Sequence, residues 1–404
     1  MKIIIAGAGI GGLTAALSLT AAGIDVVVCE RSAEILPLGV GLTLLPHAIA
    51  VVERLGLVDE IAKVATEIEH MHFRTRWGET VWDEPRGTAA GHKVPQFTIH
   101  RAALHKVLLD AMQARAPGSL RLGAKFTSFR ETRDGVTATF ENVDGTTFEV
   151  EGHGLIGADG LRSELRRRLF PEEGAPVWSG RMLWRGSVDW PSFMDGTAVA
   201  ISGGTDAKLI VYPIGPGTAP GRQLMNWALI WRTGNPGDDI PASEVWNGEA
   251  QFEEIAPLLS QFSFPEVDVA ALMAETPVFW RFPMCDRDPL PRWGRGNVTL
   301  LGDAAHPMFP FGANGAAQAM IDGAAVADAL VAEPSVAQGF AAYEKMRRPT
   351  ANKVVELNRL GGPERIIDVA ESLAQKGPLA EVFPLEQRRE ILADYAKVAG
   401  FARK

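Results

Sequence analysis

The stretch KIIIAGAGIGGLTAALSLTAAGIDVVVCE, residues 2–30, decides the fold of this chain. Residues 2–6 are a short, largely β-branched run ended by glycines, which is typical of a buried parallel strand. Residues 13–22 are rich in Ala and Leu, and Gly23 follows as a helix stop. Residues 24–29 are β-branched again. The stretch therefore predicts a strand, a glycine turn, a helix and a second strand, joined by a right-handed crossover.

The glycine turn also carries chemistry. Gly7, Gly9 and Gly12 occupy the GxGxxG positions of GAGIGG, with Gly11 between the last two. In such a turn the first glycine allows the tight bend, the second lets backbone approach a pyrophosphate, and the third lets helix and strand pack closely. Glu30 ends the second strand, where its carboxylate can accept hydrogen bonds from a ribose. The pattern predicts binding of FAD or NAD, rather than NADP, at the positive end of the helix.

The composition argues against several classes of protein. The 404 residues carry a formal net charge of −9, and phosphate binding needs clustered positive charge, so nucleic acid is not an expected partner. Only two cysteines occur, Cys29 and Cys285, which predicts no disulfide framework, no metal site and a cytoplasmic compartment. The apolar opening is compatible with a targeting or membrane-spanning segment, but its glycine pattern favours the strand and helix interpretation, with no membrane role.

Two further motifs share one design. GADGLRSELRRRL spans residues 157–169, and LLGDAAHPMFPFGANGAAQAMIDGAAVADAL spans residues 300–330. In each, an aspartate (Asp159 or Asp303) follows an apolar strand and lies in a Gly-rich turn before a helix. Asp303 can hold a polyol hydroxyl, and the backbone amides of residues 312–315 form a polar cradle at a helix start. Plain NAD binding needs neither arrangement.

With these three motifs in order, the chain resembles the class A flavoprotein monooxygenases, the family of para-hydroxybenzoate hydroxylase and salicylate hydroxylase. RDPLPRWGRGNVTLLGDAAHPMFPFGANGAAQAMID, residues 287–322, and GGPERIIDVAE, residues 361–371, look most similar to its phenazine-modifying members. The resemblance implies an enzyme that uses NADH or NADPH and O2 to hydroxylate a small aromatic or heteroaromatic substrate through a flavin C4a-hydroperoxide. No second GxGxxG follows a strand, as expected if the nicotinamide cofactor visits the flavin transiently.

The resemblance implies an α/β fold with a Rossmann-like FAD-binding domain of the GR2 type, a mostly antiparallel β-sheet substrate domain, and C-terminal helices. Asp-Gly pairs at 134–135 and 144–145 predict hairpins, and the tryptophan-rich residues 179–233 read as strands of the second sheet. We assign residues 1–70, 98–178 and 276–345 to the FAD-binding domain, residues 71–97 and 179–275 to the substrate domain, and residues 346–404 to a C-terminal helical segment.

Cofactor contacts follow position by position from the resemblance. Glu30 would bind the adenosine ribose, Arg31 would lie along the adenine, and Arg101 would touch the phosphate or ribityl region. Asp303 would hold the ribityl chain, and the backbone N–H groups of Ala313 and Asn314 would lie near O2 and N1 of the flavin. The full set of expected cofactor residues is Gly7, Gly9, Gly11, Gly12, Glu30, Arg31, Arg101, Asp159, Asp303, Pro310, Gly312, Ala313, Asn314 and Gly315.

The substrate pocket is sought in the middle sheet. Strand alternation places Met225, Trp227, Leu229 and Trp231 on one face, and Met182, Trp184, Gly186 and Val188 together on another strand. Such aromatics can be plain core, but as a set some should line a flat apolar cavity. The residues expected to contact substrate are Trp184, Tyr212, Trp227, Met308, Phe309 and Pro310.

Candidate catalytic side chains are few, because the flavin does the chemistry. His47 and Tyr212 are possible participants, and His306 reads as part of the flavin loop. Arg185 could meet a substrate carboxylate, although a surface or interdomain ion pair is favoured. The arginines at 162 and 166–168 favour a solvated helix face over a landing site for the nicotinamide cofactor.

Other functions remain open for the same fold. A reductase or a halogenase would share the FAD site, and a non-catalytic flavoprotein could act as a redox sensor. Halogenases of this fold carry a WxWxIP motif, which the tryptophans here do not show. The chain is expected to be a monomer or a homodimer.

Overall fold

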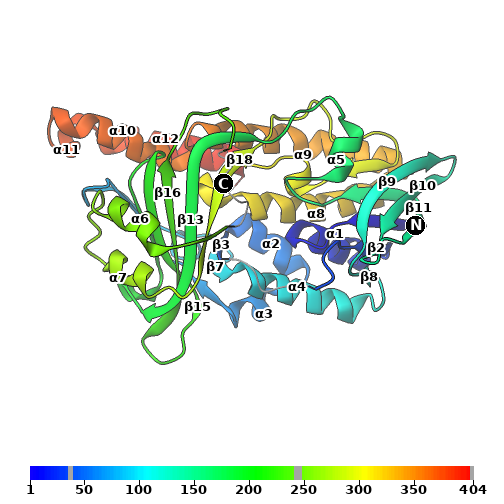
Figure 1. Ribbon diagram of the computed structural model, residues 1–404, viewed down its shortest axis with the longest axis horizontal. Coiled ribbons are helices and arrows are strands. Elements are labelled where there is room, and N and C mark those ends of the chain that lie inside the picture. The colour runs from blue at the N-terminus through cyan, green and yellow to red at the C-terminus, as the bar shows by residue number, and fades with distance from the viewer. Residues whose placement is uncertain (35–39, 241–247, 401–404) are drawn as a thin grey trace.

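The computed structural model describes residues 1–34, 40–240 and 248–400. Figure 1 shows an elongated molecule with a parallel sheet and its helices around the N-terminus, a large twisted sheet at the opposite end, and long helices running between them. Residues 35–39, 241–247 and 401–404, which fall in the three expected domains, lie outside the described residues.

The opening stretch forms the centre of the parallel sheet. Ile3, Ile4 and Ile5 are fully buried, because this sheet packs against helices and against the antiparallel strands of residues 125–152. Helix α1 (Ile10–Ala21) packs against α4 (Arg101–Arg115) and α8 (Gly315–Ala332). The strand order is β19 (Val298–Leu300), β12 (Gly154–Gly157), β1 (Lys2–Ala6), β2 (Asp25–Cys29) and β8 (Leu120–Arg121), with all neighbours parallel. The strand, helix and strand predicted from residues 2–30 are therefore confirmed.

Two small antiparallel sheets flank this core. Strands β9 (Lys125–Thr132), β10 (Gly135–Glu141) and β11 (Thr147–Gly152) turn at the two Asp-Gly pairs, as the sequence predicts. The second small sheet has the order β3 (Gly41–Leu44), β7 (Phe97–His100) and β4 (Ala65–Glu67). Short helices α2 (Pro46–Arg54), α3 (Val58–Ala62) and α5 (Glu164–Leu169) complete this half of the molecule.

The large sheet has eight strands and is antiparallel except where β14 pairs with β5. Helices α6 (Phe252–Leu259) and α7 (Val269–Ala274) lie on its outer side, at the left of the view (Figure 1). The strand order is β17 (Gly248–Ala250), β18 (Phe279–Asp286), β13 (Val177–Pro191), β16 (Arg222–Arg232), β15 (Ala207–Pro216), β14 (Ala198–Ser202), β5 (His70–Arg74) and β6 (Thr80–Pro85).

The C-terminal part is helical, with α9 (Val336–Arg359), α10 (Arg365–Leu373), α11 (Leu379–Val382) and α12 (Leu385–Ala399). The boundary expected after residue 345 falls inside α9, which is one continuous helix packed along α8. The 3-10 turn Gly362–Glu364, named η4, returns the chain to the large sheet.

One helical stretch, Phe311–Ala332, is long and apolar enough to cross a membrane. In its most apolar window 67% is buried inside the protein, and α8 packs between α1 and α9. We therefore interpret it as a core helix. The apolar N-terminal stretch likewise lies in the core, as β1, α1 and β2.

Candidate functional site: a nucleotide cleft that opens on the large sheet

A cavity of about 850 Å³ lies between the parallel-sheet half and the large sheet. Its walls come from the glycine turn after β1, the loop between β19 and α8, the inner face of the large sheet, and α12. The three sequence motifs therefore meet at one place, at the carboxyl ends of the parallel strands, where open α/β sheets bind their ligands.

The glycine turn has the form that a pyrophosphate requires. A Cβ on Gly7 would lie 2.4 Å from the carbonyl oxygen of Ala158, and one on Gly12 would lie 2.1 Å from that of Gly7. These two glycines therefore permit the close packing of turn, strand and helix. Gly9 differs, because a Cβ there would meet nothing within 4 Å, and Gly9 and Gly11 line the cavity. No side chain caps the N-terminus of α1, so its first amides are available to an anion.

Glu30 stands beside this turn. Its carboxylate accepts hydrogen bonds from the backbone N–H of Ala8 at 2.8 Å and of Ser32 at 2.9 Å, which fixes its orientation. Each carboxylate oxygen keeps a free lone pair for a ribose hydroxyl. Arg31 is exposed next to it. Arg101, at the start of α4, and Asp303, in the loop after β19, line the cavity from two further elements. The residues present therefore fit a dinucleotide such as FAD.

Asp159 is not on the cavity wall, although its neighbours Ala158 and Gly160 are. Its carboxylate accepts hydrogen bonds from Ser163 Oγ at 2.5 Å and from the backbone N–H of Glu164 at 2.8 Å. The side chain thus stabilises the first turn of α5. We correct its expected role from a cofactor contact to a support of the second motif.

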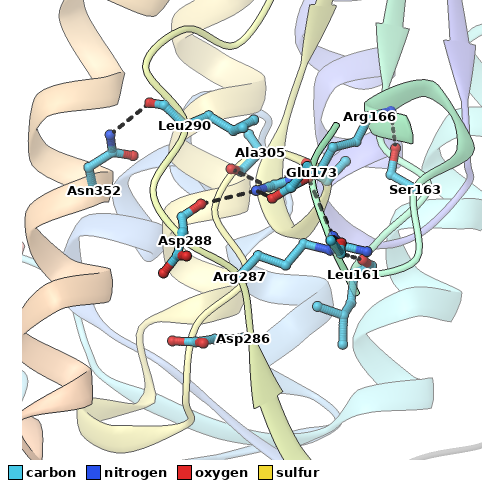
Figure 2. Close-up of polar contacts among 12 residues, drawn as sticks. Leu161, Ser163, Arg166, Glu173, Asp286, Arg287, Asp288, Leu290, Ala305 and Asn352 are labelled. Carbon is cyan, nitrogen blue, oxygen red and sulfur yellow. Dashed lines mark hydrogen bonds and ion pairs between the residues drawn. The ribbon is translucent and has the colours of Figure 1, made fainter. Parts of the chain in front are cut away.

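Arg166 joins the second motif to the third. Its guanidinium donates to the carbonyl oxygens of Ala304 at 3.1 Å and Ala305 at 2.8 Å, and to both carboxylate oxygens of Glu173 (Figure 2). The residue is only 1% exposed, whereas Arg167 and Arg168 pair with Glu164 on the surface. The expectation of a solvated basic face was therefore wrong for Arg166, because its side chain is buried and donates hydrogen bonds to backbone carbonyls of the loop that carries Asp303.

The loop Pro310–Gly315 contributes Pro310, Gly312, Ala313 and Gly315 to the cavity, next to Met308 and Phe309. Asn314 is fully buried and turned away, because its Nδ2 donates to the carbonyl of Gly312 and to the hydroxyl of Tyr395. Helix α8 starts here without a side-chain cap, and its first residues, Gly315 and Ala316, line the cavity. An uncapped N-terminus favours a group that gains negative charge.

The large sheet presents one face to the cavity through Leu183, Arg185, Ile210, Tyr212, Ala228 and Ile230. Trp184 and Trp227 lie on the other face. Nε1 of Trp227 donates to Oγ1 of Thr276 at 2.8 Å, and both tryptophans pack in the layer beneath α6 and α7. Their expected substrate contacts were therefore wrong. The alternation grouped the residues correctly, but both faces of these strands are apolar, and the helices cover the tryptophan face.

Tyr212 and Arg185 form the polar part of this wall. Arg185 Nη2 donates to the carbonyl oxygen of Gly41 at 2.6 Å, and its guanidinium lies close to the Tyr212 hydroxyl. Burial raises the pKa of Tyr212, and the nearby Arg185 opposes this effect only in part. The phenol therefore stays protonated at neutral pH. Among the described residues Arg185 forms neither the surface nor the interdomain ion pair that was favoured for it, and it lies on the cavity wall.

The two histidines singled out earlier are not on the wall. His47 lies in α2 behind the lining residues Leu45 and Pro46, and burial, with help from Arg347, lowers its pKa to about 4. Nε2 of His306 contacts Asp322 Oδ2 at 2.5 Å in a buried site. Both support the loops around the cavity. In the described ranges, no group of three metal-binding side chains occurs.

Several polar cavity residues were missed, among them Arg86, Lys208, Glu364 and Tyr395. Lys208 had a visible signal, since it alternates with Ile210 and Tyr212 along one strand. Glu364 lies in the quoted stretch 361–371, but no pattern placed that stretch at the cavity, and Tyr395 had no signal, because only the path of the C-terminal helices brings both residues there.

The geometry agrees with comparisons to known proteins. Residues 1–241 and 266–358 match the FAD binding domain family. The phenazine 1,6-dicarboxylic acid hydroxylase PhzS of Lysobacter antibioticus is 39% identical over 363 residues, which cover 88% of this chain and 89% of that protein. The 3-hydroxybenzoate 6-hydroxylase 1 of Aquipseudomonas alcaligenes is 29% identical, covering 89% and 88%.

Solved structures agree on the fold. Klebsiella pneumoniae HpxO complexed with FAD and uric acid superposes with a TM-score of 0.76 at 23% identity, covering 97% of each chain. The chain belongs to the FAD binding domain family and is a class A flavoprotein of the aromatic monooxygenase type, as the three motifs indicated. Its cofactor is FAD.

Proposed function

We propose that this enzyme hydroxylates a flat heteroaromatic ring system, of the size of a phenazine, that carries an acidic group. The observation that carries the proposal is the inner face of the large sheet, which forms an apolar wall opposite the loop Pro310–Gly315. The wall consists of Leu183, Ile210, Ala228 and Ile230. Such a wall suits a planar ring and excludes water. The resemblance to a hydroxylase of a phenazine dicarboxylic acid supports the ring class.

Arg185 is the reason for expecting an acidic group on the substrate. It lines the cavity and forms no ion pair with a carboxylate in the part of the chain that is described. The other two buried cations on the wall are already paired, Arg86 with Glu84 and Lys208 with Glu364. Arg185 is therefore available to pair with a charged ligand. Buried charges without a partner are costly, and an acidic substituent would supply one.

The chain's own residues would bind and orient the ring, while bound FAD, reduced by NADH or NADPH, supplies the activated oxygen. The apolar wall would hold the ring against the loop Met308–Pro310. The Tyr212 hydroxyl, held by Arg185, would donate a hydrogen bond to a ring substituent. We also propose the set of cofactor contacts above, other than Asp159 and the side chain of Asn314, as the FAD site.

The test is anaerobic mixing of FAD-loaded enzyme with NADH or NADPH, while bleaching of the bound flavin is followed. The panel contains phenols, monocyclic aromatic acids, phenazine and phenazine-1-carboxylate. Strong acceleration by the tricyclic acid would support the proposal. Fast reduction without any compound would point to a reductase, and no reduction under any condition would contradict the hydroxylase assignment.

Substituting Ala228 should discriminate between ring sizes. Ala228→Leu adds three carbon atoms to the cavity wall, so we expect the KM for a tricyclic substrate to rise about 10-fold, with a smaller effect on a monocyclic one. Trp227→Phe, one residue away, faces α6 and α7 and should lower stability without changing ring preference. Steady-state kinetics with both rings measures this, and equal effects of Ala228→Leu on both would remove Ala228 from the substrate wall.

We further propose a cytoplasmic enzyme, monomeric or homodimeric, with no nucleic-acid or membrane partner. Cys29 and Cys285 are both free, which agrees with a reducing compartment.

A further inference from the structure

The last helix, α12, reaches the flavin loop through one hydroxyl. Oη of Tyr395 accepts a hydrogen bond from Nδ2 of Asn314 at 2.9 Å. Its single hydrogen points toward Oδ1 of Asn358 at 2.9 Å and the carbonyl oxygen of Phe311 at 3.3 Å. Tyr395 is 3% exposed. A residue near the end of the chain therefore holds both ends of the segment Phe311–Asn314.

A second residue holds the middle of the same segment. The Glu364 carboxylate accepts the backbone N–H of Gly312 at 3.1 Å, and it is 4% exposed. Lys208 neutralises it, with Nζ at 3.5 Å from Oε1 of Glu364 and 4.0 Å from the centroid of the Phe311 ring. The large sheet, the turn η4 and the flavin loop are thus joined by one buried ion pair.

The segment needs to be held. Gly312 has φ +68° and Ala313 has φ +52°, a left-handed conformation that residues with a side chain rarely adopt. A Cβ on Gly312 would lie 2.2 Å from Oη of Tyr395, so the tyrosine packs directly on the bare Cα. Strained backbone persists only where the surrounding structure over-determines it. Tyr395 and Glu364 supply that determination.

We propose that Tyr395 and Glu364 are positioning residues, which hold Phe311–Asn314 in the shape that presents its backbone to FAD. Both lie beyond residue 358, where the family match ends. The part of the inference that concerns oxygen transfer rests on the proposed function, whereas the part that concerns FAD binding does not. Without these two side chains the segment Phe311–Asn314 relaxes, FAD binds less tightly, and water reaches the reacting centre.

The test uses Tyr395→Phe, Glu364→Gln and the double variant. Tyr395→Phe removes only the hydroxyl, and Glu364→Gln keeps an acceptor for Gly312 but removes the charge that faces Lys208. We expect FAD, titrated into apoprotein, to bind about 10-fold more weakly in each single variant, as fits the loss of the Tyr395 hydroxyl's buried hydrogen bonds in one and of the buried ion pair with Lys208 in the other. We also expect a several-fold larger share of NADH or NADPH oxidation to end in hydrogen peroxide.

Arg388→Met is the matched control. Arg388 also lies in α12 and is buried, and it donates to the carbonyl oxygens of Val81, Leu379 and Phe383, so it docks the helix without touching the loop. This variant should lower the melting temperature, yet keep the FAD affinity and peroxide share of the wild type.

Two results would overturn the inference. One is wild-type FAD affinity in the double variant. The other is a loss of affinity in Arg388→Met as large as in Tyr395→Phe, which would show that α12 acts only by docking. If FAD affinity falls as expected but the wild type hydroxylates no compound in the panel, the positioning role of Tyr395 and Glu364 is supported and the proposed function fails.

Discussion

Replacing Asp322 with alanine is expected to lower the free energy of unfolding by about 3–5 kcal/mol, because it leaves buried cationic and polar partners without their counter-charge. Asp322 is fully buried in α8. Its carboxylate accepts from Nε of Arg347 at 2.7 Å and the backbone N–H of Gly302 at 3.1 Å, and it contacts His306 Nε2. Urea denaturation of the apoprotein measures the loss, since bound FAD would add its own stabilisation.

The matched control lies on the same helix. Asp328 pairs with Arg54, but both side chains are more than half exposed, so Asp328→Ala should cost at most about 1 kcal/mol. If the two variants lose similar stability, the buried network does not stabilise the fold. Because Gly302 precedes Asp303, Asp322→Ala should also weaken FAD binding.

The same residue gives a pH dependence. Burial alone would raise the pKa of Asp322, but His306 and Arg347 outweigh it, and the pKa is lowered. A carboxyl with a lowered pKa stabilises the fold above its unfolded pKa of about 4, and this contribution is lost as pH falls through the folded value. Between neutral pH and pH 5 the stability difference between wild type and Asp322→Ala should therefore stay constant, and it should shrink in acid.

Replacing Gly9 with valine should abolish FAD binding without unfolding the protein. Gly9 has φ −70° and ψ −179°, an extended conformation open to any residue, and a Cβ there meets no atom within 4 Å. The new side chain would fill the cavity at the point where the pyrophosphate is expected. We expect the dissociation constant of FAD to rise at least about 100-fold, which corresponds to roughly 3 kcal/mol.

Stability of the apoprotein separates this from a folding defect. Gly9→Val should unfold within about 0.5 kcal/mol of the wild type, like Gly174→Val, a control at an exposed site with no atom near its Cβ. Gly12→Ala should instead destabilise the apoprotein, since its Cβ would lie 2.1 Å from a carbonyl oxygen. If Gly9→Val purifies fully loaded with FAD, the pyrophosphate does not lie at this turn.

Several elements could be predicted because their signals are local. The β-branched run before Gly7, the glycine turn and the Asp-Gly hairpins each depend on residues within a few positions of one another. The three motifs follow parallel strands, and the carboxyl ends of such strands meet at one edge, so their convergence could be foreseen. The family resemblance then pointed to FAD and to aromatic hydroxylation.

The pocket face could not be chosen from the sequence. Period-two alternation separates Trp227 from Ala228, but it does not say which of two apolar faces a helix covers. That is decided by α6 and α7, which come from a segment with no local signal for the sheet side it packs on. The tryptophans form the deeper layer, and the smaller side chains leave room for a ring.

The sequence was equally unable to predict which charged side chains are buried. Arg166 and Arg167 are neighbours in one helix. Arg166 is buried against the carbonyl oxygen of Ala305, whereas Arg167 is exposed beside Glu164. The sequence alone established the nucleotide-binding unit, because backbone turns and strand periodicity are short-range properties. Burial and the choice of partner depend on segments that are far apart in the chain, as with Tyr395 and Gly312, and only the tertiary structure decided them.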